Sequence, residues 1–203
     1  MIAIITGDII NSENYNSSEW MGVLKKYFSQ LGETPQDWEI YRGDEFQLKV
    51  SKENALQTAI HIKALVKSIK TLDVRISIGI GTETFRGAGV SESNGSAYQL
   101  SGRTFNSLKE QKLNLAISIG DENRDRTLNL MLKLALNFMD DWSTVSAEIV
   151  ALALERPAAS QTEIAEQLSI RQSAVSQRQK RARLDLVFEL LEYYTKTINE
   201  IRE

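Results

Sequence analysis

The chain of 203 residues contains no cysteine, only two prolines and a single histidine, His61. The absence of cysteine excludes disulfide bonds and thiolate metal sites, and it agrees with the cytoplasmic location that we expect. One histidine leaves little scope for a zinc centre or a Ser-His-Asp triad. No apolar run approaches the roughly 18 residues that a membrane-spanning helix requires, so we expect no contact with a membrane.

The charge is nearly balanced, because 24 Lys and Arg residues oppose 27 Asp and Glu residues and give a net charge of −3 at pH 7. A surface of this net charge does not attract nucleic acid as a whole, so DNA binding would need a local basic patch. The apolar content of 42% and the charged content of 25% are ordinary for a globular protein. The length allows one large domain or two smaller ones.

The first 140 residues alternate between strand and helix patterns. The apolar run at residues 2–5 predicts a buried strand, residues 38–50 alternate around Gly43-Asp44 as a hairpin does, and residues 74–81 alternate between branched and small side chains. Helical spacing falls between these strands, first after Ser17 or Ser18, either of which is expected to cap the helix, and then over residues 52–70. This order predicts an α+β domain with the βαββαβ topology of ferredoxin-like and palm domains.

The last strand pattern of the sequence lies at residues 113–119. It follows a helix that we expect at 97–109, and it precedes a long helix opened by Asp121. Residues 143–203 contain only helical patterns. We therefore predict two domains, residues 1–140 and an all-α domain at residues 141–203.

Acidic residues are expected to meet at one edge of the sheet. In a βαββαβ topology the first and third strands usually lie side by side and antiparallel, which would bring Asp8 next to Asp44 and Glu45. Carboxylates this close repel one another unless a cation neutralises them, and Mg²⁺ suits a carboxylate pair that substrate phosphates and water complete. The alternative is that Gly43-Asp44 is only a favourable hairpin turn.

Three motifs carry a family resemblance. Asp8 at the end of the first strand, "RGDEF" in the hairpin and "RISIGIG" in the fourth strand resemble the palm core that GGDEF diguanylate cyclases share with class III nucleotidyl cyclases. Together with "NGSAY", these motifs resemble the SatD family, a bacterial group with a cyclase-like core, over roughly residues 1–120.

This resemblance implies a metal site and a nucleotide site. Mg²⁺ or Mn²⁺ would be held by Asp8, Asp44 and the backbone carbonyl of Ile9, with a nucleotide beside Gly43 and Glu45. Glu45 and Arg103 are the candidate catalytic residues. Gly87 and Gly89 lie in a glycine-rich loop that either approaches the nucleotide or serves only as a connection.

Two departures from the cyclase pattern argue against catalysis. Arg42 stands where GGDEF proteins have their first glycine, which leaves room for the nucleotide in the active enzymes. No asparagine precedes Arg103 at the spacing that class III cyclases use. We therefore expect binding of metal and nucleotide to be retained better than cyclase activity. His61 lies off the apolar stripe of residues 52–70, and we expect it on the surface.

Residues 160–183 resemble a helix-turn-helix of the sigma-region-4 and MarR-like kinds. Thr162 is expected to cap a first helix, Ser169-Ile170 to form the turn, and a second helix to bury Ala174 and Val175. The second helix is basic and rich in hydrogen-bonding side chains, which suits phosphate anchoring and base reading. The candidate DNA contacts are Arg171, Gln172, Ser173, Ser176, Gln177, Arg178, Lys180 and Arg181. A basic helix used for dimerisation or protein contact is the alternative.

Three functions remain open on these patterns. The first is a homodimeric transcriptional regulator that senses a nucleotide with Mg²⁺ and binds DNA. The second is a nucleotidyl cyclase, or a related Mg²⁺-dependent nucleotide enzyme, that its C-terminal helices regulate. The third is an adaptor whose palm-like domain serves only for dimerisation.

Overall fold

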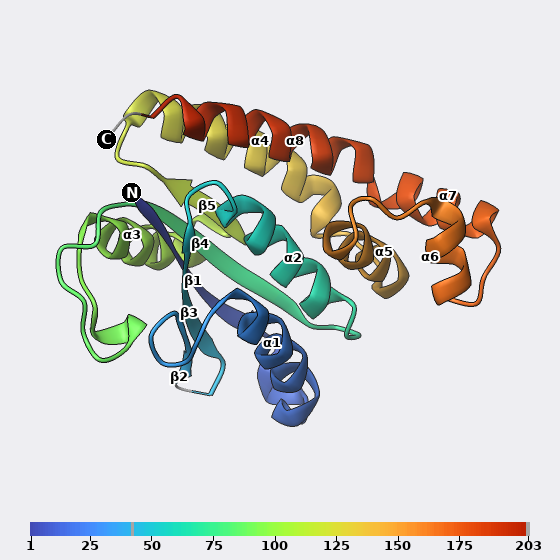
Figure 1. The fold of residues 1–203 in the computed structure, drawn as a ribbon, viewed down its shortest axis with the longest axis horizontal. Coiled ribbons are helices and arrows are strands. Elements are labelled where there is room, and N and C mark those ends of the chain that lie inside the picture. Colours follow the sequence, from blue (N-terminus) through green and yellow to red (C-terminus); the bar gives the residue numbers. More distant parts are fainter. Residues whose placement is uncertain (42, 202–203) are drawn as a thin grey trace.

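The structure is a computed structural model that describes residues 1–41 and 43–201, so the departure noted at Arg42 lies outside the described residues. Within these ranges, five strands form one sheet in the order β2-β3-β1-β4-β5 (Figure 1). The strands are β1 (Ile2–Ile10), β2 (Trp38–Tyr41), β3 (Glu45–Ser51), β4 (Asp73–Gly81) and β5 (Leu115–Ser118).

Eight α-helices accompany the sheet in the described part of the chain: α1 (Ser17–Leu31), α2 (Ala55–Lys67), α3 (Ser96–Gln111), α4 (Glu122–Met139), α5 (Thr144–Glu155), α6 (Gln161–Gln167), α7 (Gln172–Ala182) and α8 (Leu184–Asn199). Two short 3₁₀ helices are η1 (Ser12–Asn14) and η2 (Val90–Glu92). The protein therefore has a mixed α/β structure, which agrees with the predicted α+β class. No helix in the described ranges is long and apolar enough to cross a membrane.

Strand β1 is the centre of the sheet. It pairs antiparallel with β3 on one side and with β4 on the other, while β4 pairs parallel with β5. The predicted neighbourhood of the first and third strands is confirmed, and so is the predicted β2–β3 hairpin. The paired residues Tyr41 and Glu45 enclose residues 42–44, so the loop is one residue longer than a two-residue hairpin turn.

The two faces of the sheet differ in chemistry. Ala3, Ile5 and Ile9 of β1 belong to the main hydrophobic core, together with aromatic and aliphatic side chains of α1 and α2. On the other face α3 packs against β4 and β1 through small and polar groups. The hydroxyl groups of Thr6 and Ser101 are 2.8 Å apart. A Cβ atom at Gly79 would lie 2.2 Å from the Ser101 backbone nitrogen, so only glycine permits this close packing of helix on strand.

The C-terminal helices pack onto the sheet layer. Helix α5 contacts α2, and α8 contacts α4 and α2, as the side-by-side course of α4 and α8 in Figure 1 also shows. One hydrophobic cluster includes residues from both sides of the predicted boundary at residues 140–141. The Tyr194 hydroxyl of α8 donates a hydrogen bond to the Lys52 carbonyl, which anchors α8 near the end of β3. The division into two domains stays a prediction, but its two parts share a core.

Three local predictions were wrong. Asn16, rather than Ser17 or Ser18, caps α1, because its side chain accepts the Ser18 N–H. Ser160, rather than Thr162, caps α6 in a capping box with Glu163. His61 is 5% exposed rather than on the surface, because α1 covers that side of α2 and its Tyr27 ring lies 4.3 Å from the imidazole.

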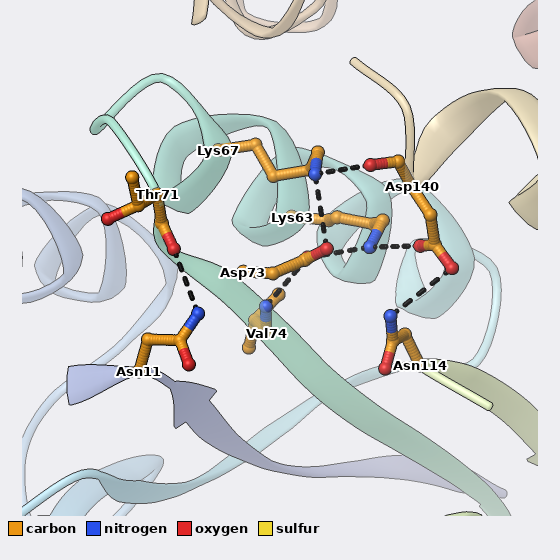
Figure 2. Close-up of polar contacts among 8 residues, drawn as sticks. All are labelled: Asn11, Lys63, Lys67, Thr71, Asp73, Val74, Asn114 and Asp140. Carbon is orange, nitrogen blue, oxygen red and sulfur yellow. Dashed lines mark hydrogen bonds and ion pairs between the residues drawn. The ribbon is translucent and has the colours of Figure 1, made fainter. Parts of the chain in front are cut away.

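A buried ion-pair cluster joins α2, β4 and the end of α4 (Figure 2). The Lys63 ammonium group, whose side chain is 1% exposed, lies 2.7 Å from Asp73 and 2.6 Å from Asp140. Lys67 pairs with the other Asp73 oxygen at 3.1 Å and donates to the Asp140 carbonyl. Asn114 donates to Asp140 as well. The positive charges of two lysines thus balance the negative charges of two aspartates at the C-terminal end of α4.

Protonation of His61 should destabilise the protein. Burial lowers the pKa of His61 from 6.5 to about 4. The unfolded chain therefore binds the proton first as the pH falls, so stability decreases between about pH 6.5 and pH 4. We expect the free energy of unfolding in urea to fall by about 2 kcal/mol more in the wild type than in His61→Gln between pH 7.5 and pH 5. An equal pH dependence in the two proteins would contradict this prediction.

The two ends of the ion-pair cluster should differ in their tolerance of substitution. Asp73→Asn leaves the buried Lys63 and the half-buried Lys67 facing one carboxylate, so we expect a loss of about 3 kcal/mol in the free energy of unfolding. Lys63→Met should cost less, because Lys67 and Asn114 still pair with the two carboxylates and methionine fills the volume. Urea denaturation at pH 7 measures both, and an equal or reversed order would show that the cluster does not act as described.

Candidate functional site

A row of charged residues crosses the sheet at the C-terminal end of β1. Asp8 pairs in register with Glu45 of β3 on one side and with Arg75 of β4 on the other. The Arg75 Nη2 atom donates to Asp8 Oδ2 at 2.9 Å. Because paired residues of neighbouring strands point to the same face, all three side chains belong to the face that α3 partly covers. The predicted meeting of Asp8 with Glu45 is thus a property of the register.

Asp44 adjoins this row from the β2–β3 loop. Its carbonyl accepts the backbone N–H of Ile9 at 3.2 Å, so the loop is bonded to the end of β1. Its carboxylate oxygen Oδ2 accepts the hydroxyl of Ser12 at 2.9 Å. Gly43 precedes it with φ of +88°, a conformation that favours glycine. The structure therefore brings Asp8, Ile9, Asp44 and Glu45 together, as the sequence predicted.

The pKa of Asp8 is shifted by its surroundings. Burial raises the pKa of Asp8 above its ordinary value, and the charges of Asp44 and Glu45 add to the rise, whereas Arg75 and the more distant Lys109 oppose it. The Asp8 Oδ1 atom is buried and has no hydrogen-bond partner within the described residues. A carboxylate in this environment is costly to hold in its charged form, and a bound cation would offset part of that cost.

The donor set suits a hard cation. Asp8 and Asp44 offer carboxylate oxygens, and a buried Asp8 oxygen still lacks a partner. Residues 1–41 and 43–201 contain no group of three or more His, Cys, Asp or Glu residues arranged to hold a metal ion. Mg²⁺ does not need such a cage, since proteins bind it through one or two carboxylates together with substrate phosphates and water. Asp8 and Asp44 therefore fit Mg²⁺ or Mn²⁺ as part of a substrate complex.

The predicted catalytic residue Arg103 lies in a different part of the sheet layer from the carboxylates. Arg103 of α3 is exposed and lines a cavity of about 650 Å³ with Met1, Gly81 and Gly120. Gly81 pairs with Ile2, so this cavity borders the opposite end of β1 from Asp8. This position could not be read from helix spacing alone, because the direction of α3 over the sheet decides it.

The glycine-rich loop is held by its own contacts. The N–H of Gly87 donates to the Ser93 hydroxyl, and a Cβ atom at Gly87 would lie 2.6 Å from Glu92. Gly89 packs against Pro35 and Glu39, with a would-be Cβ atom 3.0 Å from the Glu39 carboxylate. Both glycines therefore allow close internal packing, and nucleotide contact by Gly87 and Gly89 stays a prediction.

A second candidate surface lies on α7. Helices α6 and α7 are joined by a short turn in which Ile170 donates its N–H to the Ala165 carbonyl, and α5 packs on α7. Val175 is fully buried, while Ala174 is half-buried. The outward face of α7 presents residues at helical spacing, namely Ser173, Ser176, Gln177 and Lys180, all exposed. Arg171, Gln172, Arg181 and Arg183 are also exposed at the two ends of the helix.

Arg178 differs from the other predicted DNA contacts. It is half-buried, and its guanidinium group lies 3.4 Å from the Glu148 carboxylate of α5. It therefore points toward α5 and helps to join the two helices. Gln172, although exposed, donates a hydrogen bond to Gln161 at the start of α6. The free part of the predicted surface is thus centred on Ser173, Gln177 and Lys180 rather than on Arg178.

Three residues of the carboxylate site were missed in the sequence. Arg75 and Ser12 contact the acidic residues directly, and Lys109 of α3 influences Asp8 through its charge. A signal for Arg75 existed, because it occupies a polar-face position in the alternating segment "RISIGIG". No local pattern distinguishes Ser12 or Lys109, since their proximity to the site depends on tertiary packing.

Comparison with known proteins gives one clear relationship. A search among curated proteins finds no match. The family model of the SatD family matches residues 1–196, which include both the carboxylate row and the α7 surface. Because the match covers nearly the whole chain, the resemblance seen in the motifs of the first 120 residues extends through the C-terminal helices, and this chain belongs to the SatD family.

Proposed function

We propose that the protein is a DNA-binding transcriptional regulator whose sheet domain binds a nucleotide together with Mg²⁺ or Mn²⁺. The observation that carries this proposal is the free outward face of α7, where Ser173, Gln177 and Lys180 are exposed on a helix that two others support. In this proposal the sheet domain is a cyclase-like palm whose role is binding, and α6 and α7 are the helix-turn-helix that meets DNA, with α5 packed on α7.

The composition of the α7 surface supports DNA binding. Its exposed side chains combine hydroxyl and carboxamide groups, which can hydrogen-bond to base edges, with four exposed basic residues at its two ends: Arg171, Lys180, Arg181 and Arg183. These positive charges are concentrated on one element of a protein whose net charge is −3. A local patch of this kind is what phosphate contact requires in an acidic protein.

The carboxylate row supports the binding of a metal–nucleotide complex. Asp8 and Asp44 would hold the cation, with Glu45 and the Ile9 carbonyl beside it, and the cation would supply charge neutralisation for the phosphates. In this proposal the row binds and does not catalyse, and the candidate catalytic Arg103 lines a cavity that borders the other end of β1.

A shared cavity lies between the loop after β1 and the start of α5. Asn11, which follows β1 and adjoins Ser12, lines a cavity of about 460 Å³ that also contacts Trp142 and Thr144 at the start of α5. The Trp142 indole N–H donates to the Ala182 carbonyl at the end of α7 at 2.9 Å. In this proposal a change in the loop after β1 would reach α7 by altering this cavity and the Trp142 side chain.

A second candidate function is a Mg²⁺-dependent nucleotide enzyme that the C-terminal helices regulate. The observation that favours it is the raised pKa of Asp8 in a row with Glu45, because enzymes commonly tune carboxylates in this way. A sensor would bind the nucleotide without converting it, whereas this enzyme would convert it to a product.

DNA binding should depend on α7 and on salt. We expect the double variant Lys180→Ala/Arg181→Ala to weaken binding of a mixed-sequence DNA duplex and to reduce the slope of log K against log salt by roughly 2, because two phosphate contacts are lost. Fluorescence anisotropy at several salt concentrations measures both quantities. Lys25→Ala/Lys26→Ala on α1 is the matched control, since it removes the same charge from exposed positions of another element.

Arg178→Ala should behave differently from the α7 surface variant. It removes the partner of Glu148, so we expect a lower melting temperature and a smaller effect on the salt slope. Equal binding by the wild type and the Lys180/Arg181 variant would refute the assignment of α7 as the DNA-contacting helix.

Nucleotide binding should be detectable without product formation. We expect ATP or GTP with Mg²⁺ or Mn²⁺ to raise the melting temperature of the wild type and not that of Asp8→Asn. Chromatography of the same mixtures should show no cyclic nucleotide and no diphosphate release. Product that disappears in Asp8→Asn would favour the enzyme, whereas the absence of any thermal shift would favour the adaptor function instead.

A further inference from the structure

Arg75 occupies the position at which the proposed cation would act. It lies directly opposite Asp8 in the β1–β4 register, and its Nη2 atom is 2.9 Å from Asp8 Oδ2. Its side chain is 18% exposed, so the pair is shielded from water on most sides. In the structure an arginine therefore supplies the positive charge that a metal ion would bring to Asp8.

The Asp8–Arg75 pair is incomplete. Asp8 Oδ1 and Arg75 Nε are both buried, and neither has a hydrogen-bond partner among the described residues. An arginine that is fully engaged with a carboxylate usually makes two parallel hydrogen bonds, whereas this pair makes one. Buried polar atoms without partners cost free energy, so each side chain retains capacity for a further ligand.

We propose that Arg75 exchanges partners when the site fills: a divalent cation takes over Asp8, and the released guanidinium group binds the phosphate chain that arrives with the cation. This inference rests on the proposed function, because it assumes that the carboxylates bind a metal–phosphate complex. Arg75 is then a phosphate-binding residue, and its contact with Asp8 is a competing, resting contact.

The exchange follows from charge and geometry. A cation bound to Asp8 next to a buried guanidinium group creates a repulsion between two positive charges, so the cation weakens the present contact of Arg75 with Asp8. Arginine does not lose its proton in proteins, so it must move or find an anion. The planar fork of donors matches phosphate oxygens, and the phosphates bound to the cation are the nearest anions that the site would acquire.

The exchange has a thermodynamic consequence. The cation alone weakens the Asp8–Arg75 pair without compensation, whereas the cation–phosphate complex provides a new partner for Arg75. Cation and phosphate should therefore bind together more favourably than the cation alone, and Arg75 should be the origin of this coupling.

Direct binding measurements test the exchange without any activity assay. Electron paramagnetic resonance of free Mn²⁺ follows Mn²⁺ binding, and calorimetry follows the preformed Mn²⁺–tripolyphosphate complex. In Arg75→Gln we expect Mn²⁺ alone to bind about tenfold more tightly, because its competitor is gone, and the complex to bind about tenfold more weakly. Arg75→Lys keeps the charge and loses the fork, so Mn²⁺ binding should stay as in the wild type while binding of the complex weakens.

Two further variants complete the experiment. Arg126→Gln on α4 removes an arginine from an exposed position elsewhere and should change neither affinity. Asp8→Asn should abolish both. Melting temperatures verify that each variant is folded. If Arg75→Gln does not fold, the weaker binding of the complex by Arg75→Lys tests the exchange instead.

The outcomes separate this inference from the proposed function. If the wild type binds the complex through Asp8 but Arg75→Gln changes neither affinity, the exchange is wrong and the metal–phosphate site stands. The exchange is also overturned if Arg75→Gln weakens Mn²⁺ binding, since Arg75 would then support the cation instead of competing with it. If neither the wild type nor Arg75→Gln binds Mn²⁺ or the complex, the metal–phosphate site itself is wrong.

Discussion

The buried ammonium group of Lys63 determines how the two halves of the chain meet. Its side chain is 1% exposed on α2, so it needs carboxylates within bonding distance, and it obtains them from Asp73 at the start of β4 and from Asp140 at the end of α4. Asp140 is thereby held where the chain turns toward α5. The position of the C-terminal helices over the sheet depends on this charge balance as well as on apolar packing.

The sheet is asymmetric, and this asymmetry creates the carboxylate site. On one face large apolar side chains fill the core, while the other face keeps small residues on β4 so that α3 can approach the backbone closely. The close approach near Gly79 and Ser101 brings Lys109, further along α3, within electrostatic reach of Asp8. Bulky side chains at these β4 positions would lift α3 from the sheet, and the charged row would become fully solvated.

Much of the fold could be predicted because periodicity is local, and the failures share one cause. Alternation in β4 and the apolar stripe of α2 led directly to the observed elements. His61 and Lys63 were not recognised as buried, since a polar residue off the apolar stripe is buried only when a second layer covers it, here by α1 or by the end of α4. The cap of α6 was misplaced by two residues, because serine and threonine at neighbouring positions offer equivalent acceptors.

The same distinction between local and tertiary information applies to the two candidate surfaces. Strand register was enough to place Asp8 beside Glu45, and it also implies Arg75, which completes the row. For α7, composition alone could not separate Arg178 from Lys180, although the two differ in role because one faces Glu148 on α5 and the other faces outward. A basic residue that is bonded inward has part of its charge already balanced by its partner. Arg75 and Arg178 are both engaged by carboxylates, so a ligand that recruits either one competes with an internal ion pair.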